Sequence, residues 1–393
     1  MPTARSTLPE PDADALTHSR RLIEFIHAQI AAQGGAISFR DFMQHALYAP
    51  GLGYYTAGSH KLGEAGDFIT APESSPLFAQ CIANAIQPAL LQLNVKNILE
   101  VGAGSGIMAA GILQQLQQSD CLPDHYYILE LSSDLRARQQ QTIAQQLPEL
   151  VERVSWLDNL PNELSAVVLG NEVLDAMPVN LVQIQNGEVM ERFVALEGDR
   201  FVWRDQPPTD ERLQQRIEEI QNQTGETLPD GYISEINLLA EDWLKSLAQS
   251  LQQGLVLLID YGFPRHEYYH PQRSTGTLMC HYRHHSHDDP FCFIGLQDIT
   301  AHVDFTAIAE AAYEAGFSID GYTSQGNFLL GSGLAELAQT AEDDVKTQLL
   351  VANQIKKLTL PHEMGELFKV IGLSKQLDVP LPGFMLRDMR NYL

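Results

Sequence analysis

The feature that most constrains this 393-residue chain is a series of short apolar runs that alternate with helical stretches from Asn97 onward. The apolar runs are rich in Val, Ile, Leu and Tyr, as buried strands are, and helical sequence follows the first two. Strands that alternate with helices form a parallel sheet with helices on both faces. The sequence therefore predicts a doubly wound α/β fold. The predicted strands are NILEVG, YYILEL, RVSWL, AVVLG and LVLLIDYG.

Other stretches depart from this alternation. Residues 1–95 predict a helical and loop-rich cap, and residues 96–335 carry the sheet. An insertion at about 180–250 interrupts the sheet, with a hairpin that turns at Asn186-Gly187 and helices after it. SIDGYTSQ and NFLLGSG are expected to close the sheet as an antiparallel pair joined near Gly326. The remainder, 336–393, is expected to be helical.

The charge balance restricts the partners. The chain has 25 Lys and Arg against 50 Asp and Glu, a formal net charge of −25. Nucleic acids and anionic membranes bind clustered cations, so we expect neither as a partner. A cationic protein segment fits the acidic balance better. No apolar run is long enough to span a bilayer, so membrane insertion is not expected.

The cysteines and the N-terminal residues bear on the compartment. Four scattered cysteines form no C-x-x-C pair, which favours free thiols in a reducing environment. The first residues lack the apolar core of a secretory signal. Both observations predict a cytoplasmic protein.

A glycine-rich loop follows the first predicted strand, in the order Glu100-Val101-Gly102-Ala103-Gly104-Ser105-Gly106. Glycine permits positive φ and lets a ligand approach the backbone, and the next helix offers free N–H groups to it. A dinucleotide fingerprint, G-x-G-x-x-G, would need glycine where Ile107 stands. The loop therefore favours S-adenosylmethionine over a nicotinamide dinucleotide.

Three acids stand at the ends of successive strands. Glu100 could answer the ammonium group of S-adenosylmethionine, directly or through water. Glu130 could accept hydrogen bonds from both ribose hydroxyls, and Asp158 could accept one from the adenine amino group. Each acid alone would more often be a solvated carboxylate. Together they predict a cofactor site, because ligands of open α/β sheets bind at the carboxyl ends of the strands.

The fourth strand ends in Gly170-Asn171-Glu172-Val173-Leu174-Asp175. In such a sheet the reactive end of the ligand extends past this strand, which makes Asn171, Glu172 and Asp175 candidate catalytic residues that hold the methyl acceptor. The alternative is a polar turn in which Asp175 caps a helix.

The stretch His281 to His287 contains four histidines followed by Asp288 and Asp289. Imidazoles and carboxylates bind zinc, but no flanking pattern fixes a tetrahedral set. We therefore predict a polar loop near the acceptor pocket rather than a metal site. His302 and Asp304 could line that pocket or cap the following helix.

Several strings of the sequence resemble the MidA family of S-adenosylmethionine-dependent methyltransferases, which is related to a mitochondrial complex I assembly factor that methylates arginine. The resemblance extends from about Ile37 to Lys375, and its most specific string is Gly66 to Glu73, upstream of the glycine loop. Further strings are YAPGLGYY (48–55), the residues from Gly170 to Pro178, Asp260-Tyr261-Gly262, DITAHVDF (298–305) and PHEMGELF (361–368).

This resemblance implies a Rossmann-like class I methyltransferase sheet with an N-terminal cap, an inserted hairpin-plus-helix region and C-terminal helices. It places Asp67 and Thr70 near the cofactor. It also implies symmetric dimethylation of a protein arginine, with a respiratory complex I subunit as the partner. Guanidinium is cationic above neutral pH, so Glu172 and Asp175 would suit it.

Two other functions fit parts of the pattern. An NAD-dependent oxidoreductase uses a similar sheet, although Ile107 counts against it. A non-catalytic assembly or binding factor could retain the methyltransferase fold.

Overall fold

The computed structural model describes residues 8–57, 70–339 and 345–393, and the chain forms two compact units. The parallel-sheet unit comprises Ile69–Val173, Glu241–Gly262 and Phe305–Leu393. The hairpin unit comprises Met1–Phe68, Leu174–Ala240 and Phe263–Asp304. Each unit is thus assembled from three separate stretches of sequence.

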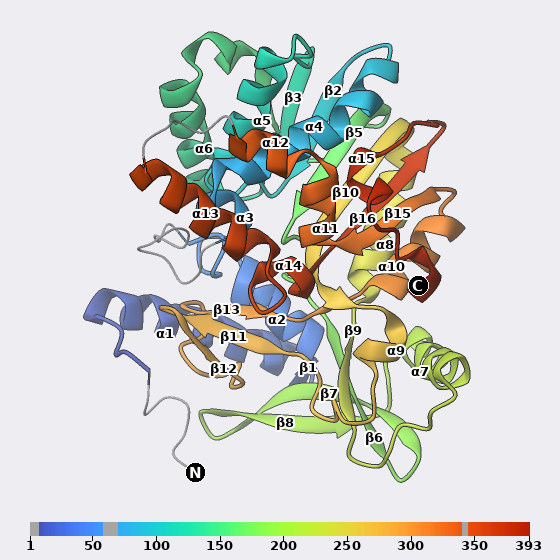
Figure 1. Cartoon of the computed structure of the whole chain (residues 1–393). Coiled ribbons are helices and arrows are strands. Elements are labelled where there is room, and N and C mark those ends of the chain that lie inside the picture. Colours follow the sequence, from blue (N-terminus) through green and yellow to red (C-terminus); the bar gives the residue numbers. More distant parts are fainter. Residues whose placement is uncertain (1–7, 58–69, 340–344) are drawn as a thin grey trace. The chain divides into compact units, whose positions relative to one another are not determined.

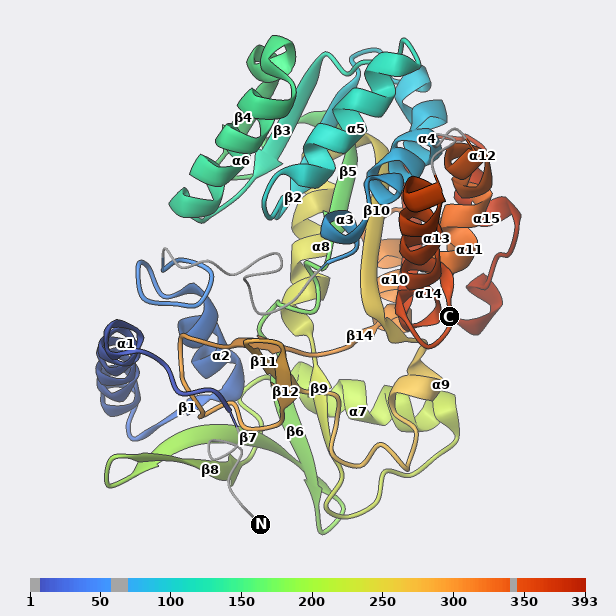
Figure 2. The same ribbon diagram turned by 60° about the vertical axis from the view of Figure 1, so that its left-hand side comes forward.

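The parallel-sheet unit is built on one sheet. Its strands are β2 (Asn97–Val101), β3 (His125–Leu129), β4 (Val154–Leu157), β5 (Leu164–Asn171), β10 (Leu251–Phe263), β15 (Ser318–Ser324) and β16 (Phe368–Lys375). They run in the order β15-β16-β10-β5-β2-β3-β4 (Figures 1 and 2). The pairs from β10 to β4 are parallel, and β16 is antiparallel to both of its neighbours. The five strands predicted from the apolar runs are confirmed.

Helices cover this sheet. They are α3 (Ala71–Ser74), α4 (Pro76–Gln92), α5 (Ile107–Gln118), α6 (Ser133–Gln146), most of α8 (Leu238–Ser250), α10 (Phe305–Glu314), α11 (Gln325–Gly331), α12 (Leu334–Gln339), α13 (Val345–Thr359), α14 (Met364–Leu367) and α15 (Pro382–Met385), with 3-10 turns at Pro148–Arg153 and Arg390–Tyr392. In Figures 1 and 2, α4 and α5 lie side by side over β2 and β5.

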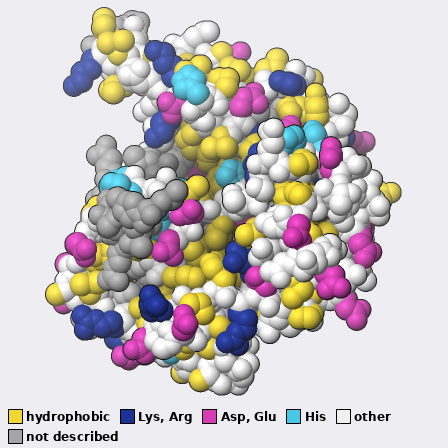
Figure 3. All heavy atoms as spheres, turned by 90° about the horizontal axis from the view of Figure 1, so that it is seen from below, with side chains coloured by type: hydrophobic (Ala, Val, Ile, Leu, Met, Phe, Trp, Pro, Cys, Tyr) yellow, Lys and Arg dark blue, Asp and Glu magenta, His cyan; other side chains and the backbone are white. Residues whose placement is uncertain are grey.

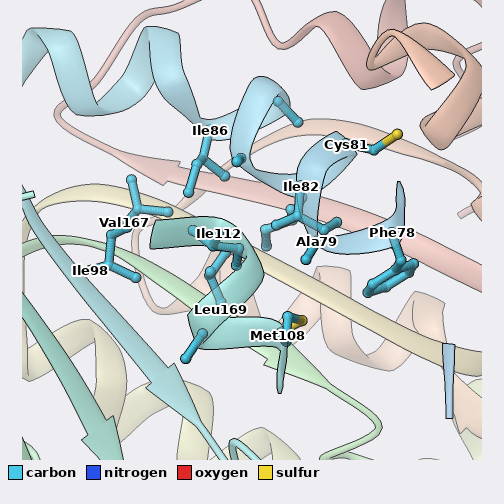
Figure 4. Close-up of a cluster of buried hydrophobic side chains, with 14 of the residues drawn as sticks. Phe78, Ala79, Cys81, Ile82, Ile86, Ile98, Met108, Ile112, Val167 and Leu169 are labelled. Atoms are coloured by element: carbon cyan, nitrogen blue, oxygen red, sulfur yellow. The ribbon is translucent and has the colours of Figure 1, made fainter. Parts of the chain in front are cut away.

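The core of this unit lies between those helices and the sheet. Ile82 of α4 and Ile112 of α5 pack with Ile98 of β2 and Val167 of β5 (Figure 4). Strand neighbours point to opposite faces, and Leu99 is buried as completely as Ile98. Burial on both faces explains why these strands are continuous apolar runs.

The prediction for the C-terminal strands was wrong in two places. The first five residues of NFLLGSG belong to helix α11, where Phe328 and Leu329 enter the core. The partner of β15 is β16, which lies within the stretch expected to be helical. Every residue of β16 from Phe368 to Ser374 is buried, so the strand shows no alternation of polar and apolar residues. A short apolar run without alternation does not distinguish a buried strand from a buried helix.

The hairpin unit contains a second, antiparallel sheet. Its strands are β1 (Ala36–Ser38), β6 (Asn180–Gln185), β7 (Glu188–Glu197), β8 (Arg200–Gln206) and β9 (Ile233–Ile236), in the order β1-β7-β6-β9 with β8 also on β7. Asn186 and Gly187 have φ of 52° and 80°, as a tight hairpin turn requires. The predicted hairpin is confirmed.

Helices pack on this second sheet, and they are α1 (Ala13–Ala32), α2 (Phe39–Tyr48), α7 (Glu211–Thr224) and the short α9 (Arg265–Tyr268). α7 lies beside β6 and β9 in Figure 2. Ile217 of α7 shares a core cluster with Val182 and Ile184 of β6. Ile26 of α1 packs with Val194 of β7. α2 lies within the N-terminal stretch that the sequence predicts to be helical and loop-rich.

The two units differ from the three contiguous segments expected from the sequence. β1 pairs with β7 in register from Ala36 opposite Ala195, so the N-terminal stretch and the insertion share one sheet. α4, expected in the N-terminal cap, instead packs into the core of the parallel-sheet unit. Strand pairing across more than 150 residues leaves no local mark in the sequence.

A three-stranded sheet, β12-β11-β13, completes the hairpin unit, with β11 (Met279–Tyr282), β12 (His285–His287) and β13 (Asp298–Thr300). The two-residue β14 (Val303–Asp304) follows it. Within the described stretches, no helix is both long and apolar enough to cross a bilayer. Cys81, Cys121, Cys280 and Cys292 are all free and buried.

The close crossing of α4 and α5 gives a test of the core. A Cβ at Gly111 would lie 2.6 Å from Cβ of Ala79. Gly111→Val should therefore overpack this crossing and lower the free energy of unfolding by about 1–3 kcal/mol, measured by urea denaturation. Gln114→Val places the same residue on the exposed side of α5 and should change it by less than about 0.5 kcal/mol. Equal stability of the two variants would mean that the helices do not meet at Gly111.

Candidate cofactor site

The glycine loop joins β2 to α5. Gly102, Gly104 and Gly106 have φ of 67°, 53° and 83°, a region that residues with a Cβ rarely adopt. The Gly102 N–H donates to the Leu129 carbonyl at 3.0 Å, which ties the loop to the end of β3. Gly106 is the N-cap of α5, so the loop leads directly into the N–H groups of the first helical turn. This is a cradle for a ligand that binds backbone N–H groups.

Glu100, at the end of β2, is almost fully buried. Its Oε2 accepts a hydrogen bond from the Tyr126 hydroxyl at 2.7 Å. Burial raises the pKa of Glu100 to about 7, against the lowering effect of Tyr126. The carboxyl is thus held by an internal tyrosine, and its contact with an ammonium group remains a prediction.

Glu130, directly after β3, has both carboxylate oxygens held in place. Oε1 accepts from the Ser132 N–H at 2.9 Å, and Oε2 accepts from Nε2 of Gln139 at 3.0 Å. Burial raises the pKa of Glu130, although these hydrogen bonds lower it. The Leu131 N–H also acts on this carboxylate and lowers its pKa. A carboxylate has about four lone-pair sites, so some capacity remains for a ligand. That capacity fits the two hydroxyls of a ribose.

Asp158 lies one residue beyond β4 and is mostly exposed, with 81% of its side chain accessible. Its Oδ1 accepts from Nη2 of Arg136 at 2.7 Å. Arg136 also donates to the carbonyls of Glu130 and Leu157, at 2.7 and 2.8 Å. The arginine therefore binds the ends of β3 and β4 together and holds Asp158 beside them.

The chain turns sharply after β5. Glu172 has φ of 53°, although it is not glycine, and its N–H donates to the Ile259 carbonyl at 2.9 Å. Nδ2 of Asn171 donates to Oε1 of Glu172 at 3.1 Å. Oδ2 of the buried Asp260 accepts from the Val173 N–H at 3.1 Å. Left-handed backbone at a non-glycine residue is strained, and such strain is concentrated at functional sites.

Asp175 belongs to the hairpin unit, whereas Glu172 belongs to the parallel-sheet unit. No helix starts after Asp175, because residues 172–179 lead directly to β6, so the helix-cap alternative is wrong. Asp175 is buried, and its carbonyl accepts from the Ala301 N–H at 3.0 Å.

Aromatic residues of the YAPGLGYY string lie in the same part of the hairpin unit. The Tyr48 hydroxyl donates to the Ala176 carbonyl at 3.0 Å, and the Tyr55 hydroxyl donates to Oδ2 of Asp298 at 2.9 Å. Burial raises the pKa of Tyr55, and Asp298, Tyr48 and Asp175 raise it further. Three strings that are distant in sequence therefore meet around Asp175.

The remaining predicted site residues lie in different parts of the structure. Thr70 is the N-cap residue of α3, and the Ser105 hydroxyl donates to Glu73 in that helix. Asp67 lies outside the described residues. The His302 ring stacks on Phe263 with centroids 5.4 Å apart, and Asp304 forms a 3.3 Å ion pair with Arg265.

The histidine stretch is a β-hairpin rather than an irregular loop. β11 and β12 pair through it, and Arg283 and His284 occupy its turn with φ of 46° and 62°. Burial lowers the pKa of His287. Across the described part of the chain, no group of three His, Cys, Asp or Glu residues is placed to hold a metal ion.

The sequence did not single out the side chains that hold these groups in place, namely Tyr126, Arg136, Gln139 and Asp260. Tyr126 and Asp260 lie within predicted strands, where an isolated polar atom among apolar neighbours is a usable signal. Arg136 and Gln139 lie in α6, among similar polar residues that are mostly exposed. Only the fold distinguishes them from those neighbours.

The sheet order, with β2 between β3 and β5 and an antiparallel β16, together with this loop and these acids, defines a class I methyltransferase. Residues 81–323 match the family described as "Putative S-adenosyl-L-methionine-dependent methyltransferase". The chain belongs to this family, is a methyltransferase, and uses S-adenosylmethionine as its cofactor. The predicted resemblance to the MidA family is confirmed.

Solved structures and curated relatives agree with this assignment. A protein from Burkholderia thailandensis, whose crystal structure contains S-adenosyl-homocysteine, is 44% identical, with a TM-score of 0.94 over 98% of this chain and 100% of that one. The protein arginine methyltransferase NDUFAF7 homolog of Drosophila melanogaster is 26% identical, over 96% of this chain and 91% of the relative. The NDUFAF7 protein of Mus musculus is 28% identical, over 86% and 81%.

The raised pKa of Glu100 predicts a pH-dependent stability. The unfolded carboxyl ionises near pH 4.5 and the folded one near 7, so its contribution is complete below 4.5 and is lost as the pH rises through 7. Glu100→Gln keeps an acceptor for Tyr126 but removes this titration. Relative to the wild type, its free energy of unfolding should rise by about 2–3 kcal/mol between about pH 5 and about pH 8. Urea unfolding at both pH values measures the difference, and a constant difference would contradict the prediction.

Removal of the Glu130 carboxylate should weaken cofactor binding. Glu130→Ala leaves the ribose hydroxyls without their acceptor, which costs about 1–3 kcal/mol of binding free energy. Calorimetry with S-adenosylmethionine measures this loss. Glu149→Ala, at an exposed position, is the control and should bind as the wild type does. An unchanged dissociation constant for Glu130→Ala would mean that another residue holds the ribose.

Proposed function

We propose that this methyltransferase acts on the arginine side chain of a protein and forms symmetric dimethylarginine. The observation that carries the proposal is the name shared by relatives that match over 81–91% of their length, protein arginine methyltransferase. A respiratory complex I subunit is the first acceptor to test, as the MidA resemblance implies.

The chemistry of the acceptor supports the proposal. Guanidinium is a planar cation that stays charged at neutral pH, so it needs carboxylates to orient it and to take up a proton. Glu172 and Asp175 are the carboxylates we assign to this role, and we assign Asn171, which donates to Glu172, to the same acceptor site. When bound, S-adenosylmethionine supplies an electrophilic methyl group on a sulfonium sulfur. The arginine nitrogen forms the new bond to that carbon, the sulfur keeps the electron pair of the broken bond, and the nitrogen loses a proton.

The backbone at the end of β5 supports a role for Glu172. Its strained φ of 53° is held by the bond from its own N–H to the Ile259 carbonyl. Asp260 holds the next residue through the Val173 N–H. Because hydrogen bonds hold the strained backbone at Glu172 and at the next residue, the direction of the Glu172 carboxylate is fixed. Alignment of the reacting atoms is the main source of acceleration in methyl transfer.

The surface charge suits a cationic protein segment. The formal net charge is −25, and on the face drawn in Figure 3 the Lys and Arg side chains lie in small separate groups among acidic ones. Nucleic acids need a continuous basic surface, so we propose a protein as the partner.

A labelling experiment tests the acceptor. The protein is incubated with S-adenosylmethionine carrying a radiolabelled methyl group and with a cell lysate, and the labelled protein is hydrolysed to amino acids. We expect the label in symmetric dimethylarginine. Label in another amino acid would refute arginine as the acceptor. A complete lack of labelling, with cofactor binding intact, would favour the non-catalytic assembly factor.

Conversion of Asp175 to its amide separates binding from transfer. Asp175→Asn keeps the size of the side chain but removes the charge that orients the guanidinium. Turnover should fall by about a hundredfold, while calorimetry shows unchanged affinity for S-adenosylmethionine. The control is Asp199→Asn, at an exposed position of the hairpin unit, which should be fully active. Normal transfer by Asp175→Asn would remove this residue from the acceptor site.

A further inference from the structure

Gln139 is an unusual residue in its helix. α6 is largely polar, and Gln139 and Ile143 are its buried residues. Gln139 is fully buried, whereas Gln140 and Gln141, the next two residues, are exposed. Burial of an amide is unfavourable unless its donors and acceptor find partners. The position of these partners indicates what Gln139 does.

The amide of Gln139 joins three elements at the cofactor site. Its Nε2 donates to the Gly104 carbonyl at 3.1 Å and to Oε2 of Glu130 at 3.0 Å. Its Oε1 accepts from Nε1 of Trp156, in β4, at 2.8 Å. The indole N–H is only a donor, so this last bond fixes which end of the amide faces Glu130. Nε2 must therefore face the glycine loop and the carboxylate.

The lack of a side chain at Gly106 lets α6 approach the glycine loop closely. A Cβ at Gly106 would lie 3.0 Å from Cα and 3.3 Å from Cβ of Gln139. The Thr142 hydroxyl, one turn along α6, donates to the Ser105 carbonyl at 2.8 Å. α6 is thus held directly against the loop, and Gln139 reaches the centre of the site.

Gln139 also completes the environment of Glu130. The Ser132 N–H holds Oε1 and Gln139 holds Oε2, so the plane of the carboxylate is fixed from both sides. The donor is neutral, so it orients the carboxylate without neutralising it as an ion pair would. The carboxylate keeps some capacity for a hydrogen bond from a ligand.

From this geometry we propose that Gln139 is a positioning residue for the cofactor, which aligns the Glu130 carboxylate with the ribose hydroxyls and so makes binding selective for an intact ribose. The proposal rests on the assignment of Glu130 to the ribose. It gives Gln139 a role distinct from packing, because a packing residue would affect cofactors with and without a ribose hydroxyl equally.

The first test compares two ligands, S-adenosylhomocysteine and its 2′-deoxy analogue. Gln139→Met keeps the length of the side chain and removes its hydrogen bonds. We expect its affinity for S-adenosylhomocysteine to fall about tenfold, and its affinity for the 2′-deoxy analogue to fall less than about threefold. Gln140→Met, at the neighbouring exposed position, should bind both ligands as the wild type does. Equal losses for the two ligands, or no loss, would overturn the proposal.

A second variant serves if Gln139→Met does not fold. Gln139→Glu retains the acceptor for Trp156 but puts a carboxylate against Glu130. Two adjacent carboxylates share a proton at low pH and repel each other once both ionise. Glu100 and Arg136, the other charged groups that act on this pair, are unchanged. As the pH rises from about 6 to about 8, the affinity of Gln139→Glu for S-adenosylhomocysteine should fall. We expect this fall to be about tenfold larger than the change in the wild type over the same range. Wild-type pH dependence would contradict the role of Gln139, and Gln140→Glu is the control.

The same two ligands separate failure of this proposal from failure of the Glu130 assignment. Glu130→Ala should lose the preference for the intact ribose. If it keeps that preference, the ribose is held elsewhere and both ideas fail. If Glu130→Ala loses the preference but Gln139→Met keeps it, Glu130 binds the ribose and Gln139 does not position it.

Discussion

The parallel pairing of β2 with β3 on one side and with β5 on the other is the constraint on which the predicted cofactor site depends. The chain continues from β2 to β3 on one side of β2, and later to β5 on its other side. The loops after these strands therefore diverge at one edge of the sheet. That divergence leaves room for a ligand at the carboxyl ends of the strands. The glycine loop, Glu130 and the strained turn at Glu172 all lie at that edge.

Polar groups buried at this edge hold one another in place. Glu100 is paired with Tyr126, Glu130 with Ser132 and Gln139, and Asp260 with the Val173 N–H. Burial raises the pKa of both glutamates, which is unfavourable for the folded state at neutral pH. The fold thus gives up some stability to keep these carboxylates fixed, a cost that a preorganised binding site at this edge would carry.

The hairpin unit shows how residues distant in sequence meet. Tyr48, Asp175 and Asp298 come from three separate stretches, and the hydrogen bonds of Tyr48 and Tyr55 join those stretches within one unit. Three of the strings that carried the MidA resemblance, 48–55, Gly170 to Pro178 and 298–305, meet there. Their physical role in this unit is to fix the backbone around Asp175.

The sequence by itself determined the class of fold, the five central strands, the glycine loop and the Asn186-Gly187 hairpin. These features are local, because a buried strand needs a run of apolar residues and a positive φ favours glycine or asparagine. Only the tertiary structure decided that β16 is a strand, that β1 joins the insertion, and that Gln139 differs from Gln140. A fully buried strand lacks alternation, and pairing over long sequence distances leaves no local mark. A polar helix does not show which glutamine faces the core, because that depends on where the sheet lies against it.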